Sequence, residues 1–362
     1  MMKITFYLPG ADNVKSGGYK VIFKYSEMLA DRGHDVSIIY SNHNMRGVKI
    51  LYNILPLRKM LVYRKFGKRP TWYDLDDRVK VIYAFKGYND PAIPDADVVI
   101  ATAADTAEEV AKLPVSKGGK WYFVQDHEIW VKGEEYSNYS YTFPLKIITI
   151  SKYLKKLVAK YSNEEIFVVK NAIQLDKFYV TNPIRERDKY SVAMLNHKLP
   201  NKGSKYGIEA IKMLKNDYPQ LKAHLFGTCE RPADLPEWIT YTQNASEEEL
   251  RKIYNFAAIF ISPVINEGFG LTGAESMACG CTLVSSDYDA VHEYAVDGDN
   301  AMLCPAKDSK ALYESVKKCI EDDDLRFRLA EQGVKDTKKM SWERCTERFE
   351  QILKGDYVEN ES

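Results

Sequence analysis

The sequence predicts an α/β fold with two domains in series, each a parallel sheet covered by helices on both faces. The chain has 362 residues, more than the roughly 250 to 300 that a single hydrophobic core usually serves. Short apolar runs alternate with helical patterns along almost all of it, as in sheets whose parallel strands are joined by helices. The polar, proline-containing stretch 181–189 interrupts this alternation and resembles a linker. We therefore expect a first domain over residues 1–182 and a second over residues 183–340.

The strands of the first domain are predicted from apolar runs of four to six residues. They are 3–8, 35–40, 80–85, 97–102, 121–125, 146–150 and 166–170. Helices are expected to begin near Gly18, Asp105 and Lys152. Because open parallel sheets bind ligands beyond the carboxyl ends of their strands, we expect the functional groups in the loops that follow these strands.

The second domain repeats the pattern. Its predicted strands are 191–195, 221–226, 238–242, 258–263, 282–285 and 302–305, and its helices begin near Gly203, Ser246, Leu271, Asp289 and Ser309. The tail 341–356 is also predicted to be helical, with an apolar face formed by Trp342, Cys345, Phe349 and Leu353. We expect this last helix to pack back on the first domain.

Composition excludes several classes of function. The 51 basic and 51 acidic residues balance, so no overall field favours nucleic acid as a partner. The opening residues lack the apolar core of a secretory signal, and no stretch approaches the ~18 apolar residues of a membrane span. The six cysteines lack zinc-site spacing, and we expect them to be reduced and mostly buried. The sequence therefore predicts a cytoplasmic protein.

The most informative motif is the stretch 266–280, NEGFGLTGAESMACG, which follows the strand predicted at 258–263. Gly268 and Gly270 allow the main chain to come close to a ligand. The helix beginning near Leu271 offers N–H groups without partners in the helix and the positive end of its dipole, which suit a diphosphate. Thr272 adds a hydroxyl donor.

Two carboxylates flank this predicted anion site. Glu267 precedes the helix and Glu275 lies about one turn inside it. Carboxylates repel phosphate but accept hydrogen bonds from hydroxyl groups, as sugar and ribose rings at either end of a diphosphate would offer. The alternative is a glycine-rich connection with two solvated acids.

At this stretch the sequence resembles the retaining family-four glycosyltransferases of GT-B fold, whose hallmark is two Glu residues separated by seven others, here Glu267 and Glu275. The resemblance covers nearly the whole second domain and the first only in patches. It also includes Lys202-Gly203 and the stretches 148–151, 171–178, 285–293 and 297–300.

The resemblance implies a role for each matching residue. Glu267 would contact hydroxyl groups of the donor sugar, and Glu275 those of the ribose. The backbone of Phe269, Gly270, Leu271 and Thr272 would hold the sugar and phosphate. Lys202 would neutralise the departing diphosphate, a role that suits a compact point charge.

The sequence departs from the family pattern five residues before Lys202. These enzymes usually carry Arg there, whereas this chain has His197, with Lys198 beside it. A neutral histidine cannot replace the fixed charge of a guanidinium. Either His197 is protonated against the phosphate or Lys198 supplies the charge, and a surface loop with neither role is the alternative.

Two loops of the first domain carry further candidates. Gly17 and Gly18 follow the first strand and precede a helix, without the glycine spacing of dinucleotide-binding proteins. We expect them to lie near the reacting sugar. Asp126 and His127 follow the strand 121–125, and in the resembled family an Asp or His at this place touches the donor sugar. A plain turn is the alternative.

The stretch 46–69 is basic, contains no acid and is interleaved with apolar side chains. This pattern suits peripheral contact with an anionic membrane or the binding of an anionic acceptor. A solvated basic loop is the alternative.

The sequence thus predicts a retaining transfer of a hexose-type sugar from a nucleoside-diphosphate sugar to a glycan, lipid or other hydroxyl acceptor. We expect no cofactor and no metal, because protein cations and the helix dipole would supply the positive charge. The alternatives are a sugar-nucleotide epimerase or phosphorylase of the same fold, a dinucleotide-dependent oxidoreductase, and a carbohydrate-binding protein without turnover.

Overall fold

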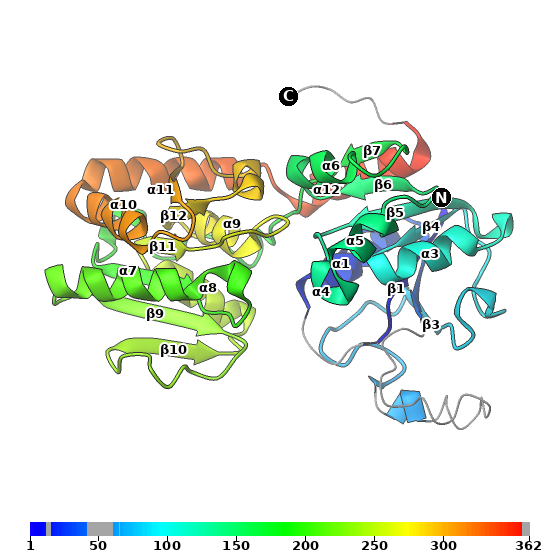
Figure 1. The fold of residues 1–362 in the computed structure, drawn as a ribbon, viewed down its shortest axis with the longest axis horizontal. Coiled ribbons are helices and arrows are strands. Elements are labelled where there is room, and N and C mark those ends of the chain that lie inside the picture. Colours follow the sequence, from blue (N-terminus) through cyan, green and yellow to red (C-terminus); the bar gives the residue numbers. More distant parts are fainter. Residues whose placement is uncertain (12–15, 42–60, 65, 357–362) are drawn as a thin grey trace. The chain divides into compact units, whose positions relative to one another are not determined.

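The computed structural model of the chain describes residues 1–11, 16–41, 61–64 and 66–356. It divides into two compact units, each built on its own sheet (Figure 1). The first unit comprises Met1–Lys170 with Cys345–Ser362, and the second comprises Asn171–Arg344. Most of the basic stretch 46–69 lies outside the described residues. Within the described ranges, no helix has both the length and the apolar character needed to cross a membrane.

The sheet of the first unit has seven parallel strands in the order β3-β2-β1-β4-β5-β6-β7. The predicted α/β architecture is confirmed, and the observed strand ends differ from the predicted ones by at most two residues. The strands are β1 (Lys3–Leu8), β2 (Asp35–Tyr40), β3 (Lys80–Tyr83), β4 (Val98–Ala101), β5 (Gly119–Val124), β6 (Lys146–Thr149) and β7 (Ile166–Val168).

Helices of the first unit follow the strands, as expected for parallel connections. Those predicted near residues 18, 105 and 152 are α1 (Gly17–Asp31), α3 (Ala104–Lys112) and α6 (Lys152–Val158). Two short helices after β5 were not predicted, α4 (Ile129–Lys132) and α5 (Glu134–Ser140). Each spans at most two turns, too short for helical periodicity to appear in the sequence.

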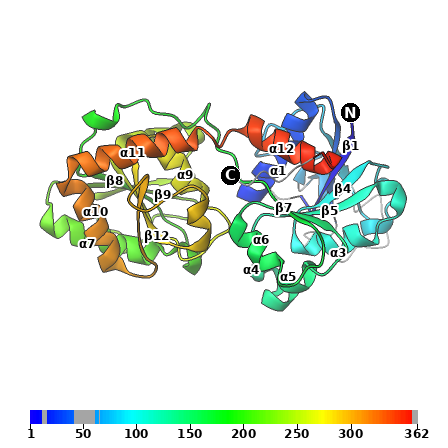
Figure 2. The ribbon, with the colours of Figure 1, turned by 90° about the horizontal axis from the view of Figure 1, so that it is seen from above.

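The C-terminal helix α12 (Trp342–Lys354) lies beside α1 in the first unit (Figure 2). Phe349 is fully buried, and its ring centroid lies 4.6 Å from that of Tyr25, 5.4 Å from Phe123 and 6.2 Å from Phe6. The face predicted from helical spacing is buried along its length. One aromatic side chain of α12 therefore joins residues from β1, α1 and β5 into one core.

A buried charge also holds α12 in place. The Glu350 carboxylate pairs with Arg32 and Lys354 and accepts a hydrogen bond of 3.0 Å from His34 Nε2. His34 Nδ1 accepts the N–H of Met2, so the proton on the neutral ring is at Nε2. Burial acts to raise the pKa of Glu350, but hydrogen bonds from Lys354, Arg32 and His34 outweigh it and lower this pKa to about 2.

The sheet of the second unit has six parallel strands in the order β10-β9-β8-β11-β12-β13. All six correspond to predicted strands. They are β8 (Ser191–Leu195), β9 (Lys222–Gly227), β10 (Ile239–Gln243), β11 (Ile259–Ser262), β12 (Thr282–Asp287) and β13 (Ala301–Pro305).

The helices of the second unit are α7 (Ser204–Asp217), α8 (Glu247–Phe256), α9 (Leu271–Ala278), α10 (Ser309–Glu321) and α11 (Asp323–Thr337). The helix α11 was not predicted. The helix expected near Asp289 is only a short 3-10 segment, Asp289–Glu293. It ends early because the Asn300 side chain binds the carbonyl of Tyr294 and the N–H of Val296.

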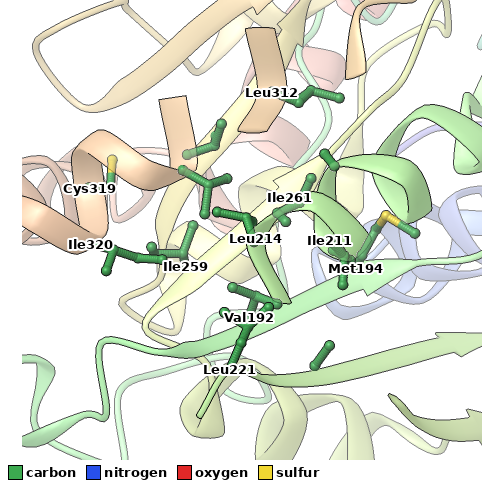
Figure 3. Close-up of a cluster of buried hydrophobic side chains, with 14 of the residues drawn as sticks. Val192, Met194, Ile211, Leu214, Leu221, Ile259, Ile261, Leu312, Cys319 and Ile320 are labelled. Carbon is green, nitrogen blue, oxygen red and sulfur yellow. The ribbon is translucent and has the colours of Figure 1, made fainter. Parts of the chain in front are cut away.

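Alternate residues of the central strands face opposite sides of this sheet. Ile259 and Ile261 of β11 point into a cluster with Leu214 of α7 and Leu312 of α10 (Figure 3). Phe260 between them packs on Tyr254 of α8, with ring centroids 5.5 Å apart. The sheet is therefore covered on both faces, as the continuous apolar strand sequences predict.

The stretch 181–189 is not a free linker. It belongs to the second unit, whose boundary lies at Lys170/Asn171, earlier than the expected 182/183. Arg187 is 5% exposed and donates to the carbonyls of Asn182, Tyr254, Ala257 and Cys279. Within this polar stretch, Arg187 satisfies buried backbone carbonyls of residues far away in the sequence, a pairing that local sequence does not reveal.

Replacing Glu350 by Gln should lower the free energy of unfolding of the first unit by about 1.5 to 3 kcal/mol at pH 7, the contribution of hydrogen bonds to a charged group. Because the folded-state pKa is depressed, this stabilisation is present above about pH 4.5 and is lost as pH falls toward 2. The difference between parent and variant should therefore shrink from pH 5 to about pH 2. Urea unfolding combined with hydrogen exchange of the α12 amides measures it.

The matched control is Glu347→Gln, which removes an exposed carboxylate from the same helix. It should change stability by less than about 0.5 kcal/mol. Equal effects of the two variants would contradict the role of the Glu350 cluster.

Candidate functional site

The predicted anion site in the second unit lies between β11 and α9. Gly270 precedes α9 in the left-handed region, with φ of 101°. A side chain there would collide with the hydroxyl groups of Tyr288 and Tyr294. Gly268 and Phe269 are buried, and Leu271 and Thr272 are half-buried in the first turn of α9. The glycine is therefore needed both for the backbone conformation and for a close approach.

Lys202 and Glu267 form an ion pair between Nζ and Oε2, although they are 65 positions apart. Their side chains are 22% and 11% exposed. Lys202 ends the short 3-10 segment Pro200–Lys202 after β8, and Glu267 lies in the loop after β11. The structure thus brings together two of the residues that the sequence analysis selected.

Hydrogen bonds tie these two loops to each other. The carbonyl of Asn201 accepts the N–H of Ile265 at 2.8 Å, and Asn201 Nδ2 donates to the carbonyl of Asn266 at 2.9 Å. Gly203, with φ of 67°, directly precedes α7 and lies against the carbonyl of Pro263. The position of Lys202 relative to Glu267 is therefore fixed mainly by backbone contacts.

His197 and Lys198 occupy different environments. His197 is half-buried, its N–H donates to Ser204 Oγ at 2.8 Å, and its Nδ1 accepts the N–H of Leu199 at 3.0 Å. Burial, and then the charge of Lys202, lower the pKa of His197, with Glu267 opposing them. In this site the neutral ring is favoured over the protonated one. Lys198 is exposed.

Glu275 is half-buried one turn inside α9. Its Oε2 accepts a hydrogen bond of 3.3 Å from the hydroxyl of Tyr254 on α8. Burial, and then the Glu275 charge, raise the pKa of Tyr254, so the phenol remains a donor. Sequence analysis did not select Tyr254, because a tyrosine on the apolar face of a helix is expected to be a residue of the hydrophobic core.

Tyr288 and Tyr294 are also additions to the predicted set. Both are at most 6% exposed, and their hydroxyl oxygens lie 3.1 Å apart beside Gly270. The Tyr288 hydroxyl donates a hydrogen bond of 3.3 Å to the carbonyl of Phe269. No sequence motif indicated that these side chains meet the loop after β11.

The first unit gathers a separate set of polar groups at the carboxyl ends of β1, β4 and β5. Gly17 and Gly18 begin α1, and Gly18 faces the side chain of Gln125. Asp126 Oδ1 accepts the N–H of His127 at 2.8 Å, and His127 Nε2 lies 3.1 Å from Asn138 Oδ1. Since an amide oxygen only accepts, the imidazole donates from Nε2.

Glu128, which the sequence analysis did not select, also lies in this loop. Its Oε2 accepts the N–H of Ala104 at the start of α3, at 2.7 Å. Burial raises the pKa of Glu128 to about 7, the Ala104 hydrogen bond opposes this shift, and the charges of Asp126 and Asp105 add to it. The loop therefore contains one carboxyl group that titrates near neutral pH.

The structure describes no group of three or more His, Cys, Asp or Glu side chains placed to hold a metal ion, within the ranges given above. Five of the six cysteines are buried, Cys229 is half-buried, and all six are free thiols.

Replacing Gly203 by Ala should lower the free energy of unfolding of the second unit by more than the ~1 to 2 kcal/mol of a left-handed alanine. The added Cβ would overlap the backbone carbonyl of Pro263, which cannot move without disturbing β11. Gly298→Ala is the matched control, because Gly298 has φ of 72° and no atom within 4 Å of the added carbon. Urea unfolding of both variants measures the difference, and equal losses would contradict the close approach at Gly203.

Comparison with known proteins identifies the second unit. Residues 180–336 match the family model described as glycosyl transferases group 1. An uncharacterized glycosyltransferase of Methanocaldococcus jannaschii is 27% identical over 224 residues, which cover 59% of this chain and 61% of that protein. The O-antigen chain mannosyltransferase B of Escherichia coli is 33% identical over 109 residues, which cover 30% of this chain and 28% of that protein. The match thus spans less than two thirds of either relative.

The fold extends over the whole chain. The structure of HepE from Anabaena in complex with UDP-glucose superposes with a TM-score of 0.70 and 15% identity, covering 98% of this chain and all of that one. At this identity the likeness concerns the fold, which is the GT-B arrangement of two parallel-sheet domains. Residues 180–336 therefore resemble the group 1 glycosyl transferases, within a chain whose two parallel-sheet units have the GT-B fold.

Proposed function

We propose that this protein is a retaining glycosyltransferase that moves a hexose-type sugar from a nucleoside-diphosphate sugar to a hydroxyl acceptor. The ion pair between Lys202 and Glu267 beside the first turn of α9 is the observation that carries this proposal. A donor offers an alternative partner to each member: its anionic diphosphate to the lysine and its sugar hydroxyls to the carboxylate. Glu275 would receive the ribose hydroxyls while Tyr254 holds it in place.

In the proposed reaction the bond between the sugar C1 and the diphosphate oxygen breaks, and the electron pair stays on that oxygen. Lys202 and the N–H groups at the start of α9 stabilise the developing charge. The acceptor hydroxyl attacks C1 from the same face. Its proton then lies next to the departing phosphate oxygen, which can take it. These protein groups supply the positive charge, so the proposal includes no metal or other cofactor.

The nature of donor and acceptor is proposed from the relatives. HepE was solved with UDP-glucose, and the E. coli relative is named as a mannosyltransferase of the O-antigen chain. We propose a role in cell-surface polysaccharide or glycolipid synthesis on this basis.

The basic stretch 46–69 would bring a cytoplasmic protein to the anionic inner face of the membrane or to an anionic acceptor. Sedimentation with anionic vesicles at low salt tests the membrane contact, and a protein that stays in solution excludes it.

The direct test is thermal stabilisation by a panel of nucleoside diphosphates and their sugars, because a ligand that binds the native state raises its apparent stability. A stabilising donor is then used in a transfer assay, with the anomeric configuration of the product read by NMR. Donor binding without transfer or hydrolysis would instead support a binding protein. Release of the free sugar phosphate or an epimerised donor would indicate the other enzymes of this fold.

Glu275→Gln should weaken binding of the bare nucleoside diphosphate roughly tenfold or more, since hydrogen bonds to a charged group contribute about 1.5 to 3 kcal/mol. Glu267→Ala should lower turnover without weakening that binding, because it removes a sugar contact and frees Lys202 for the phosphate. Calorimetry with the bare diphosphate distinguishes the two. An unchanged affinity in Glu275→Gln, or an equal loss in both, would show that the roles are misassigned.

Lys202→Ala should lower kcat by ~10²-fold or more, the range found when one preorganised charge-stabilising donor is removed. Lys205→Ala removes an exposed lysine three positions away and should leave kcat unchanged. Steady-state kinetics with the stabilising donor provides the comparison. A raised KM with intact kcat would mean that Lys202 binds substrate and transition state equally.

A further inference from the structure

Arg187 joins the C-terminal ends of two helices in the second unit. It precedes β8 and is 5% exposed. Its Nη1 atom donates to the carbonyls of Tyr254 at 3.2 Å and Ala257 at 3.0 Å, at the end of α8. Its Nη2 atom donates at 2.6 Å to the carbonyl of Cys279, the residue that follows α9. One buried guanidinium therefore binds the ends of α8 and α9 at the same time.

The chemistry of a guanidinium suits this place. The last carbonyls of a helix have no partner within the helix, and the negative end of its dipole favours a cation there. The remaining donors of Arg187 reach the Asn255 Oδ1 atom at 3.1 Å and the carbonyl of Asn182 at 2.9 and 3.1 Å. A lysine offers its donors at one point on a flexible stem and cannot bind all of these oxygens.

The contacts of Arg187 close a ring that includes Glu275. Tyr254 gives its carbonyl to Arg187 and donates its hydroxyl to Glu275 Oε2 at 3.3 Å. Cys279 gives its carbonyl to Arg187, and its N–H donates to the carbonyl of Glu275 at 3.1 Å. The side chain and the backbone of Glu275 are thus both linked to the same guanidinium, each through one intervening residue.

We propose that Arg187 is a positioning residue for the donor site, because it fixes α8 against α9 so that Tyr254 holds the Glu275 carboxylate in place. This inference rests on the proposed function, in which Glu275 receives the ribose hydroxyls. Glu275 is the group that would touch the nucleotide. Arg187 acts on it through Tyr254 and through the backbone of α9.

Nucleotide affinity tests this chain of contacts. Arg187→Lys keeps the charge but loses the fork, so it should weaken binding of bare UDP or GDP by about threefold to tenfold. In the Glu275→Gln background it should have no further effect, because it reaches the nucleotide only through Glu275. Calorimetry on the parent, both single variants and the double variant measures this. Losses that simply add, or an unchanged affinity in Arg187→Lys, would overturn the proposal while leaving the proposed function in place.

Arg326→Lys is the matched control. Arg326 is 4% exposed, and its Nη1 atom donates at 2.7 Å to the carbonyl of Cys319 in α10. The variant disturbs the same kind of bond in the same unit, but at another helix. It should leave nucleotide affinity unchanged. Equal losses in the two arginine variants would overturn the proposal and indicate general destabilisation.

Three buried cysteines report on these two arginines without any ligand. Cys279 and Cys319 are fully buried, and Cys281 is 1% exposed. Burial raises the pKa of all three thiols, so they should react slowly while the native packing persists. Under native conditions, Arg187→Lys should speed iodoacetamide labelling of Cys279 and Cys281 about tenfold and leave Cys319 unchanged. Arg326→Lys should do the reverse, and mass spectrometry of the labelled peptides distinguishes the sites.

The labelling pattern separates a local effect from a global one. Equal acceleration at all three cysteines in Arg187→Lys would show that the whole unit opens, and would overturn the proposal. Selective labelling of Cys279 and Cys281, together with a non-additive loss of nucleotide affinity, would support it. In a protein that binds neither UDP nor GDP, selective labelling would support the link between α8 and α9 and would count against the proposed function.

Discussion

The ion pair between Lys202 and Glu267 is the constraint around which the second unit is arranged. Both side chains are largely buried. A charge without a partner is costly in such a place. Each therefore needs the other as long as no ligand is present. Backbone contacts fix the two side chains relative to each other. Asn201 binds the loop after β11, and Gly203 lies so close to Pro263 that only a glycine fits.

In the proposed function, a highly polar donor would enter this site without first exposing bare charges. A ligand that carries an anion next to several hydroxyl groups replaces one set of partners by another. A ligand with only one of these features would leave either a lysine or a glutamate unpaired in a half-buried place. The proposed donor would therefore need both features together. In the first unit, the Glu128 loop shows a different solution, because burial there favours the neutral carboxyl group.

Sequence reasoning located the sheet strands and singled out the loop of the predicted anion site because both depend on local patterns. Runs such as Ile259–Ser262 are apolar on both faces, and the Glu267 and Glu275 spacing lies within one continuous segment. It missed α11, whose many charged residues hide its buried face, and it read 181–189 as a linker although Arg187 is buried there. It also missed Tyr254, Tyr288 and Tyr294, because the site residues that they meet, Glu275 and Phe269, are 19 to 25 positions away and a tyrosine in an apolar context gives no local signal.

The chain leaves the first unit at Lys170 and returns to it at Cys345, so the second unit is inserted between two parts of the first. The aromatic core around Phe349 lacks its central ring until the last helix has been synthesised. Synthesis runs from the N-terminus, so all residues of the second unit are made before the first unit receives its C-terminal part. The order of the two units along the chain is thus the reverse of the order in which their cores can be completed, and Tyr25 and Phe123 remain without the ring that covers them until α12 has been synthesised.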